Sequence, residues 1–86
     1  MKEIKMFMME TCPHCKKALS MIEELLAAHP EYKEIPFKKI DERKEPEFTA
    51  KFKYYYVPTF FVGDKKIHEG VPTKAAVMKV FMEAFD

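Results

Sequence analysis

The chain has 86 residues, of which 48% are hydrophobic and 34% are charged, as in one ordinary soluble domain. Its 15 basic and 14 acidic residues leave a net charge of +1, so charge gives no reason to expect binding to nucleic acid or to an anionic membrane. No apolar run approaches the roughly 18 residues that span a bilayer. We therefore expect a single domain over residues 1–86 with neither a nucleic-acid nor a membrane partner.

The amino-terminal segment is apolar only over residues 6–9, and charged residues stand on both sides of that run. A secretory signal would instead show a longer apolar stretch followed by a small-residue cleavage site. We therefore expect a cytoplasmic protein. In that compartment, two closely spaced cysteines indicate a redox or metal site more than a structural disulfide.

Apolar periodicity and turn residues predict the secondary structure in chain order. A strand over 2–9 is apolar on both faces toward its end, which is typical of a central strand. Thr11 or Cys12 then caps a helix whose apolar positions recur at helical spacing until His29-Pro30. The other predicted elements are strands over 35–40, 56–62 and 65–69, a short helix over 45–53 and a final helix capped by Thr73.

This order, β-α-β-α-β-β-α, predicts an α/β fold with a four-stranded mixed sheet and three flanking helices. The first two strands are joined by a helix and should be parallel. The last two are joined by a tight turn at Gly63-Asp64 and should form an antiparallel hairpin. The side chains expected to face inward from the last two helices are Phe48, Phe52, Val77, Val80, Phe81 and Phe85.

Cys12 and Cys15 carry the chemistry that the sequence suggests. In a first helical turn they lie on one face, and a small adjustment brings them within disulfide distance. Cys12 lies at the helix N-terminus, where unpaired N–H groups favour an anion, so we expect it to be the exposed thiolate that attacks the substrate. Cys15, one turn further on the apolar stripe, is expected to resolve the resulting mixed disulfide. The alternative without a chemical role is that both cysteines are buried and structural.

Pro13 and His14, between the two cysteines, are the expected modulators of the site. Pro13 suits the first helical turn, where its missing N–H costs nothing. Protonated His14 would stabilise the thiolate, and an exposed histidine without effect is an equal alternative.

Three segments in this order resemble the thioredoxin superfamily, and in length its smaller glutaredoxin branch. They are Thr11-Cys12-Pro13-His14-Cys15 after the first strand, Val57-Pro58-Thr59 before the third, and Gly70 ahead of the last helix. The resemblance covers nearly the whole chain and implies a thioredoxin-like fold with thiol–disulfide oxidoreductase activity on protein or small-molecule disulfides. It also implies a cis proline facing the cysteines and substrate pairing with the neighbouring backbone. The substrate-binding residues that it implies are Val57, Pro58, Thr59, Gly70 and Val71.

The chain departs from both branches of the superfamily. Glutaredoxins usually have a lysine for the glutathione carboxylate where Met9 stands, and their glycine pair near the last helix becomes Gly70-Val71-Pro72. Pro72 has no N–H to donate, so we expect glutathione to bind poorly. Thioredoxins usually have a buried aspartate where Met6 stands and a tryptophan before the first cysteine, and this chain has no tryptophan.

The expected chemistry needs no metal and no resident organic cofactor, and electrons would come from glutathione or from a dedicated reductase. We expect a monomer whose partners are a disulfide substrate and this electron donor. The main alternative is a metal-binding module, either copper chaperone-like or bridging an iron–sulfur cluster, in which Cys12 and Cys15 are ligands with Met9 or His14 nearby. An interaction domain with inactive cysteines is a further alternative.

Overall fold

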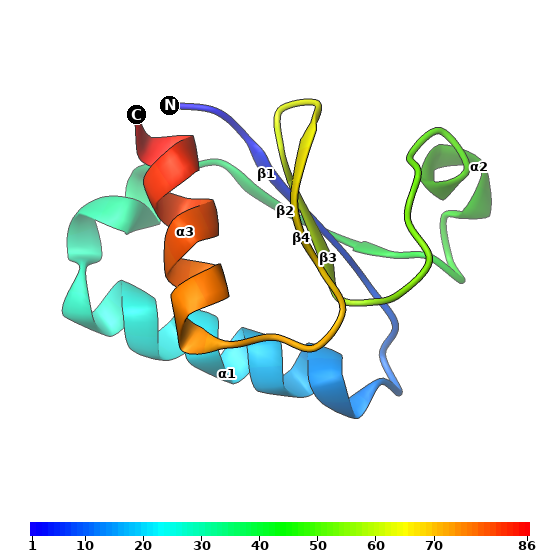
Figure 1. The fold of residues 1–86 in the computed structure, drawn as a ribbon, viewed down its shortest axis with the longest axis horizontal. Helices are drawn as coiled ribbons and strands as arrows, with labels where there is room; N and C mark the ends of the chain where they lie inside the picture. Colours follow the sequence, from blue (N-terminus) through cyan, green and yellow to red (C-terminus); the bar gives the residue numbers. More distant parts are fainter.

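The computed structural model describes residues 1–86 as a four-stranded mixed sheet flanked by helices (Figure 1). The strand order is β2-β1-β3-β4, with β1 parallel to β2 and antiparallel to β3, and β4 antiparallel to β3. This confirms the predicted α/β architecture. The elements are β1 (Ile4–Met8), α1 (Pro13–Ala28), a 3₁₀ helix (Pro30–Glu34), β2 (Phe37–Asp41), α2 (Pro46–Thr49), β3 (Thr59–Val62), β4 (Lys65–Glu69) and α3 (Lys74–Phe85).

Strand β1 is the central element and is buried on both faces, as its sequence predicts. Successive side chains of a strand point to opposite faces of the sheet. Ile4, Met6 and Met8 therefore enter the main core beneath α1 and α3, whereas Phe7 enters a second cluster on the opposite face. Because both faces of β1 are covered, only one register buries all of its apolar side chains. This register fixes where the strand ends.

The second cluster is aromatic and attaches α2 to the sheet. Phe48 and Phe52 face inward as predicted, and the Phe52 ring centroid lies 4.8 Å from that of Phe7. Tyr54 lies 5.0 Å from Phe7 on the same measure. Helix α2 is shorter than predicted, because beyond Thr49 the chain continues in turns closed by hydrogen bonds such as Phe52 N–H to the Thr49 carbonyl.

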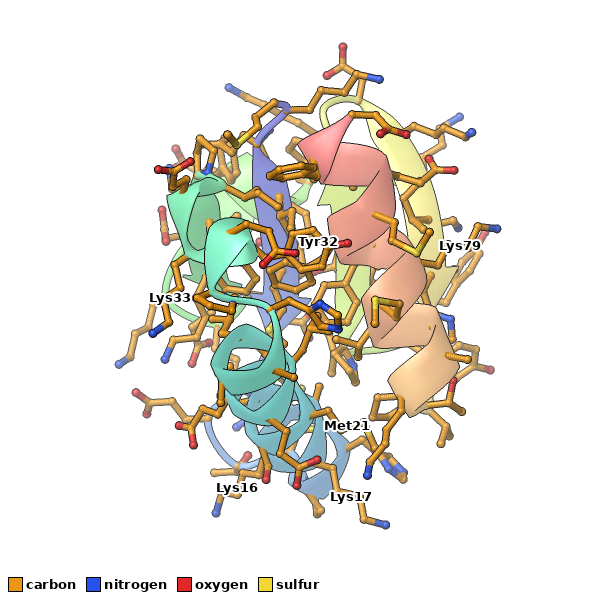
Figure 2. All side chains as sticks on the ribbon, turned by 90° about the vertical axis from the view of Figure 1, so that its left-hand side faces the viewer. Lys16, Lys17, Met21, Tyr32, Lys33 and Lys79 are labelled. Carbon is orange, nitrogen blue, oxygen red and sulfur yellow. The ribbon has the colours of Figure 1, made fainter.

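Helices α1 and α3 cover the other face of the sheet, where Figure 2 shows Tyr32 beside α3 and Met21 on α1. Tyr32 belongs to the 3₁₀ helix, which was not predicted, and its ring centroid lies 5.3 Å from that of Phe85. Phe85 was expected inside but is 38% exposed, because Ala84 takes the fully buried position at the end of the apolar stripe. No helix combines the length and the apolar character needed to cross a membrane.

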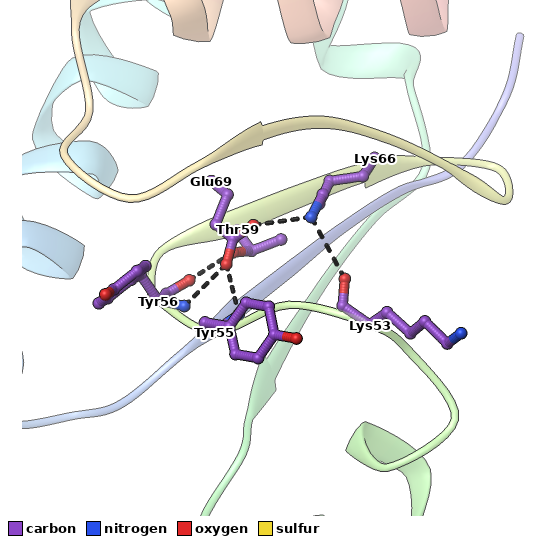
Figure 3. A network of polar contacts seen from close by, with 6 residues as sticks. All are labelled: Lys53, Tyr55, Tyr56, Thr59, Lys66 and Glu69. Carbon is purple, nitrogen blue, oxygen red and sulfur yellow. Dashed lines mark hydrogen bonds and ion pairs between the residues drawn. The ribbon is translucent and has the colours of Figure 1, made fainter.

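The third strand begins later than predicted, at Thr59 and not at 56. Pro58 has no N–H to donate to a ladder. The N–H groups of Tyr55 and Tyr56 donate to the Glu69 carboxylate and not to a neighbouring strand (Figure 3). The tyrosine run Tyr54–Tyr56 therefore forms a loop, and the expectation that Tyr56 begins the strand is wrong. Strands β1 and β2 are likewise trimmed or shifted relative to the predicted 2–9 and 35–40.

Thr73 caps α3 as predicted, since its Oγ1 accepts a hydrogen bond of 3.0 Å from the N–H of Ala76. Losing such a cap costs about 1 kcal/mol of folding free energy. We expect Thr73→Ala to lower the free energy of unfolding by about that amount in urea denaturation, and Thr73→Ser to preserve it. Equal stability of the alanine and serine variants would contradict the capping role.

Candidate active site

The two cysteines lie where β1 passes into α1. Cys12 is the N-cap residue of α1, with an extended backbone (φ −81°, ψ 118°), and Pro13 occupies the first helical position. An N-cap side chain is normally placed to accept a hydrogen bond from the second or third N–H of its helix. Cys12 makes no such side-chain bond in this structure, and the N–H of His14, the second of these, has no hydrogen-bond partner in the chain. A thiolate on Cys12 would therefore meet an unpaired donor and the positive end of the helix dipole.

Cys12 is less exposed than its sequence position suggested. Only 9% of it is accessible, so the description of Cys12 as an exposed thiolate needs correcting: it presents one small edge to solvent. It is enclosed because its Sγ lies 3.9 Å from the Val57 carbonyl oxygen, to which the thiol donates. Cys15 has no exposed surface at all. A substrate arriving from solvent can therefore reach Cys12 and not Cys15.

Burial also makes Cys15 a very weak acid. Loss of hydration raises its pKa to about 12, and the hydrogen bond and charge of Cys12 and the negative charge of Glu42 act in the same direction. A hydrogen bond from the Met9 backbone N–H partly opposes them. In the reduced protein Cys15 is thus held as a neutral thiol directly behind Cys12.

Glu42 was not singled out in the sequence. It follows β2, and its N–H donates to the carbonyl of Met8 at the end of β1 over 3.0 Å. Its Oε1 accepts a 2.7 Å hydrogen bond from the Tyr54 hydroxyl, whose pKa is raised by burial and by this contact with Glu42. The carboxyl ends of parallel strands meet at one edge of a sheet, so the predicted parallel pairing of the first two strands was the available signal for this neighbour.

The Val57–Pro58 segment stands opposite the cysteines. Its peptide bond is cis, as the family resemblance implied. The Pro58 carbonyl accepts a 2.9 Å hydrogen bond from the N–H of Gly70, whose φ of 95° suits glycine. The structure therefore joins this segment to the loop before α3, in addition to placing Val57 beside Cys12.

The remaining predicted site residues differ in their surroundings. Thr59 is fully buried, and its hydroxyl donates to the carbonyl of Tyr56. Val71 is 62% exposed, and its carbonyl lies 2.9 Å from Nε2 of His68. Pro13 and His14 are exposed beside Cys12, and the imidazole of His14 has neither a hydrogen bond nor an ion pair within the chain. Cys12, Cys15, Val57 and Pro58 are thus brought together, while Thr59 and Val71 use their polar groups internally.

The fold and the cysteine placement together define a thioredoxin-like protein. A family model described as thioredoxin domain matches residues 2–82, and the chain belongs to this family. The family assignment supports a thiol–disulfide oxidoreductase role and does not favour the metal-binding alternative. No group of three or more His, Cys, Asp or Glu side chains is arranged to hold a metal ion.

Individual relatives agree with this assignment. The chain is 27% identical over 77 residues to a thioredoxin of Methanocaldococcus jannaschii, covering 90% of this chain and 88% of the relative. Its fold resembles the oxidised thioredoxin of Plasmodium falciparum (TM-score 0.70, 24% identity, 94% of this chain and 78% of that one). It also resembles the reduced desulfothioredoxin of Desulfovibrio vulgaris Hildenborough (TM-score 0.68, 22% identity, 95% and 80%). At these identities the two structures support the fold alone.

The unequal surroundings of the cysteines predict unequal alkylation. We expect iodoacetamide at pH 7.5 to label Cys12 of the reduced protein at least about 100-fold faster than Cys15, because alkylation needs an accessible thiolate. Peptide mapping by mass spectrometry after timed quenching would measure both rates. Unfolding in guanidinium chloride serves as the control and should make the two rates similar. Comparable labelling in the folded protein would refute the assigned asymmetry.

Proposed function

We propose that this protein is a dithiol–disulfide oxidoreductase that reduces disulfide bonds with Cys12 and Cys15. The observation that carries the proposal is the geometry of the pair: Cys12 is the helix N-cap, with its Sγ 3.9 Å from the Val57 carbonyl, and Cys15 lies fully buried behind it. The first cysteine can therefore meet a substrate sulfur, and the second can meet only the first.

The proposed reaction proceeds through two exchanges. The thiolate of Cys12 attacks one sulfur of the substrate disulfide, the substrate S–S bond breaks, and the departing sulfur takes up a proton. The thiol of Cys15 then loses its proton and attacks Cys12 in the mixed disulfide, which releases the second substrate sulfur as a thiol. Two electrons pass from the dithiol to the substrate, and a Cys12–Cys15 disulfide remains.

The high pKa of Cys15 supports this order of events. With a pKa of about 12, Cys15 is protonated at neutral pH and does not compete for the first attack. One contribution to that pKa is the interaction with Cys12 itself. When Cys12 enters a mixed disulfide it can no longer carry a negative charge, so this contribution disappears at the step in which Cys15 must ionise.

The proposal extends to the partners of the reaction. We place the protein in the cytoplasm, where the net direction is reduction, as a monomer without a resident metal or organic cofactor. Its electron donor is a dedicated reductase in preference to glutathione. In support, Met9 offers no charge to the glutathione carboxylate, and the N–H of Gly70 already donates to Pro58. The hydroxyl oxygen of Thr73, which follows Pro72, already accepts the capping hydrogen bond at the start of α3.

Cysteine substitutions test the two roles. Cys12→Ser should abolish insulin reduction in a turbidity assay with dithiothreitol, measured above the uncatalysed rate, because the nucleophile is gone. Cys15→Ser should accumulate a mixed disulfide with the substrate, visible by non-reducing electrophoresis, because no second thiol releases it. Insulin reduction by Cys12→Ser at the wild-type rate would falsify the assignment.

The preference for a dedicated reductase is tested separately. We expect slow reduction of hydroxyethyl disulfide with glutathione and glutathione reductase, and faster turnover with NADPH and a thioredoxin reductase. A charge-assisted hydrogen bond contributes roughly 1.5–3 kcal/mol, so each missing glutathione contact should weaken binding at least about tenfold. Met9→Lys restores one contact and should raise the glutathione-dependent rate, with Met9→Leu as its uncharged control. A glutathione-dependent rate that already exceeds the reductase-dependent rate would refute this preference.

A further inference from the structure

Two tyrosine rings stand in solvent immediately before the Val57–Pro58 segment. Tyr55 is 90% exposed and Tyr56 is 71% exposed, which makes them the two most exposed large hydrophobic side chains of the protein. Their neighbour in the run, Tyr54, packs against the Phe7 cluster instead. These two consecutive exposed tyrosines have no evident role in the stability of the domain. Rigid amphipathic rings are characteristic of binding surfaces.

The backbone beneath the rings is held by Glu69. Its Oε2 accepts hydrogen bonds from the N–H groups of both Tyr55 and Tyr56, the latter at 2.9 Å, as Figure 3 shows. Lys66 donates to the other carboxylate oxygen over 2.7 Å and to the Lys53 carbonyl over 3.4 Å. The Lys66 hydrogen bond and the two backbone donors lower the pKa of Glu69 to about 2. The Glu69 carboxylate therefore stays negatively charged over the whole pH range in which the protein would be assayed.

These bonds determine how the loop can meet a substrate. Both tyrosine N–H groups are committed to Glu69, and the Tyr56 carbonyl accepts from the Thr59 hydroxyl. These backbone groups are therefore already paired and disfavour an extension of strand pairing beyond Val57, and the rings are the most exposed part of the loop. The Glu69 carboxylate beneath the rings is paired with Lys66, so the two groups together offer no net charge that would select a charged substrate side chain. A large apolar side chain is the chemistry that fits.

We propose that Tyr55 and Tyr56, positioned by Glu69, bind an extended polypeptide segment of the disulfide substrate through an apolar side chain close to its reactive cysteine. The proposal rests on the proposed function, because it names the substrate class of that site. The location supports a polypeptide: Tyr56 directly precedes Val57, whose carbonyl lies 3.9 Å from Cys12 Sγ. Residues of an extended chain are spaced by about 3.3 Å, so a polypeptide that passes Val57 continues along the loop toward Tyr56, whereas a small disulfide has no chain that could do so.

Steady-state kinetics on matched substrates test the proposal. The substrates are two peptides with one intramolecular disulfide each, flanked by leucine or by glycine, and hydroxyethyl disulfide as the small substrate. We expect Tyr55→Ala/Tyr56→Ala to raise KM for the leucine-flanked peptide about tenfold, which corresponds to about 1.4 kcal/mol, and to leave its kcat unchanged. KM for the glycine-flanked peptide and for hydroxyethyl disulfide should change less than about twofold.

Further variants separate binding from general damage. Tyr55→Phe/Tyr56→Phe keeps both rings and should retain the wild-type KM. Glu69→Ala should raise KM for the leucine-flanked peptide in the same way without changing kcat. Glu69→Gln still offers a carbonyl oxygen to the N–H groups of Tyr55 and Tyr56, so its KM should lie between those of the wild type and Glu69→Ala. Met82→Ala removes a side chain that is 53% exposed on α3 and should change nothing.

The outcomes distinguish the two proposals. An equal effect of the tyrosine variant on all three substrates, or no effect on any, would overturn the docking role while leaving the oxidoreductase function intact. Failure of the phenylalanine variant to retain the KM would overturn the ring contact as its basis. A wild-type protein that reduces none of the three disulfides would overturn the proposed function and the docking role with it.

Discussion

The hydrogen bond between Cys12 and the Val57 carbonyl joins the two halves of this molecule at the point where chemistry is proposed to occur. Cys12 is the N-cap residue of α1, four residues after the end of β1, and Val57 belongs to the loop ahead of β3. The antiparallel pairing of β1 with β3 runs from Ile4 opposite Val62 to Phe7 opposite Thr59, which brings the end of one strand to the start of the other. A shift of this register would move Cys12 away from the Val57 carbonyl.

The same geometry gives the two cysteines opposite properties. Cys12 is the N-cap residue, with 9% of its surface exposed and the unpaired N–H of His14 nearby in the chain, whereas Cys15 is inside the first helical turn and has no exposed surface. An unpaired backbone N–H favours a charge, and an apolar core penalises one. Only two residues, Pro13 and His14, thus separate an environment suited to a thiolate from one suited to a thiol. No additional ionisable residue is needed to create the difference, although Glu42 strengthens it.

Features set by local physics could be predicted from the sequence, and features set by distant partners could not. The Cys12–Pro13 start of α1 follows from capping preferences and from a proline tolerated in a first turn. The parallel pairing of β1 with β2 and the antiparallel hairpin of β3 with β4 follow from the connections that join these strands. By contrast, the tyrosine run has strand propensity but forms a loop in which Glu69, thirteen residues beyond Tyr56, accepts hydrogen bonds from the N–H groups of Tyr55 and Tyr56. The approach of Glu42 to Cys15 could have been anticipated from the predicted pairing of the first two strands, whereas the hydrogen bond that the Glu42 carboxylate accepts from Tyr54, twelve residues further on, could not.

The loops opposite the cysteines are connected to one another mainly through the backbone. Gly70 reaches the Pro58 carbonyl, and Cys12 reaches the Val57 carbonyl, without any contribution from the side chains of Val57 or Val71. Such contacts survive substitution of the exposed side chains around them, including the rings of Tyr55 and Tyr56. The side chains that face a substrate can therefore vary while the surroundings of the nucleophile stay constant. In the proposed reaction, reactivity depends on the helix terminus and the core, and substrate choice depends on a loop whose backbone is held by the Glu69 carboxylate.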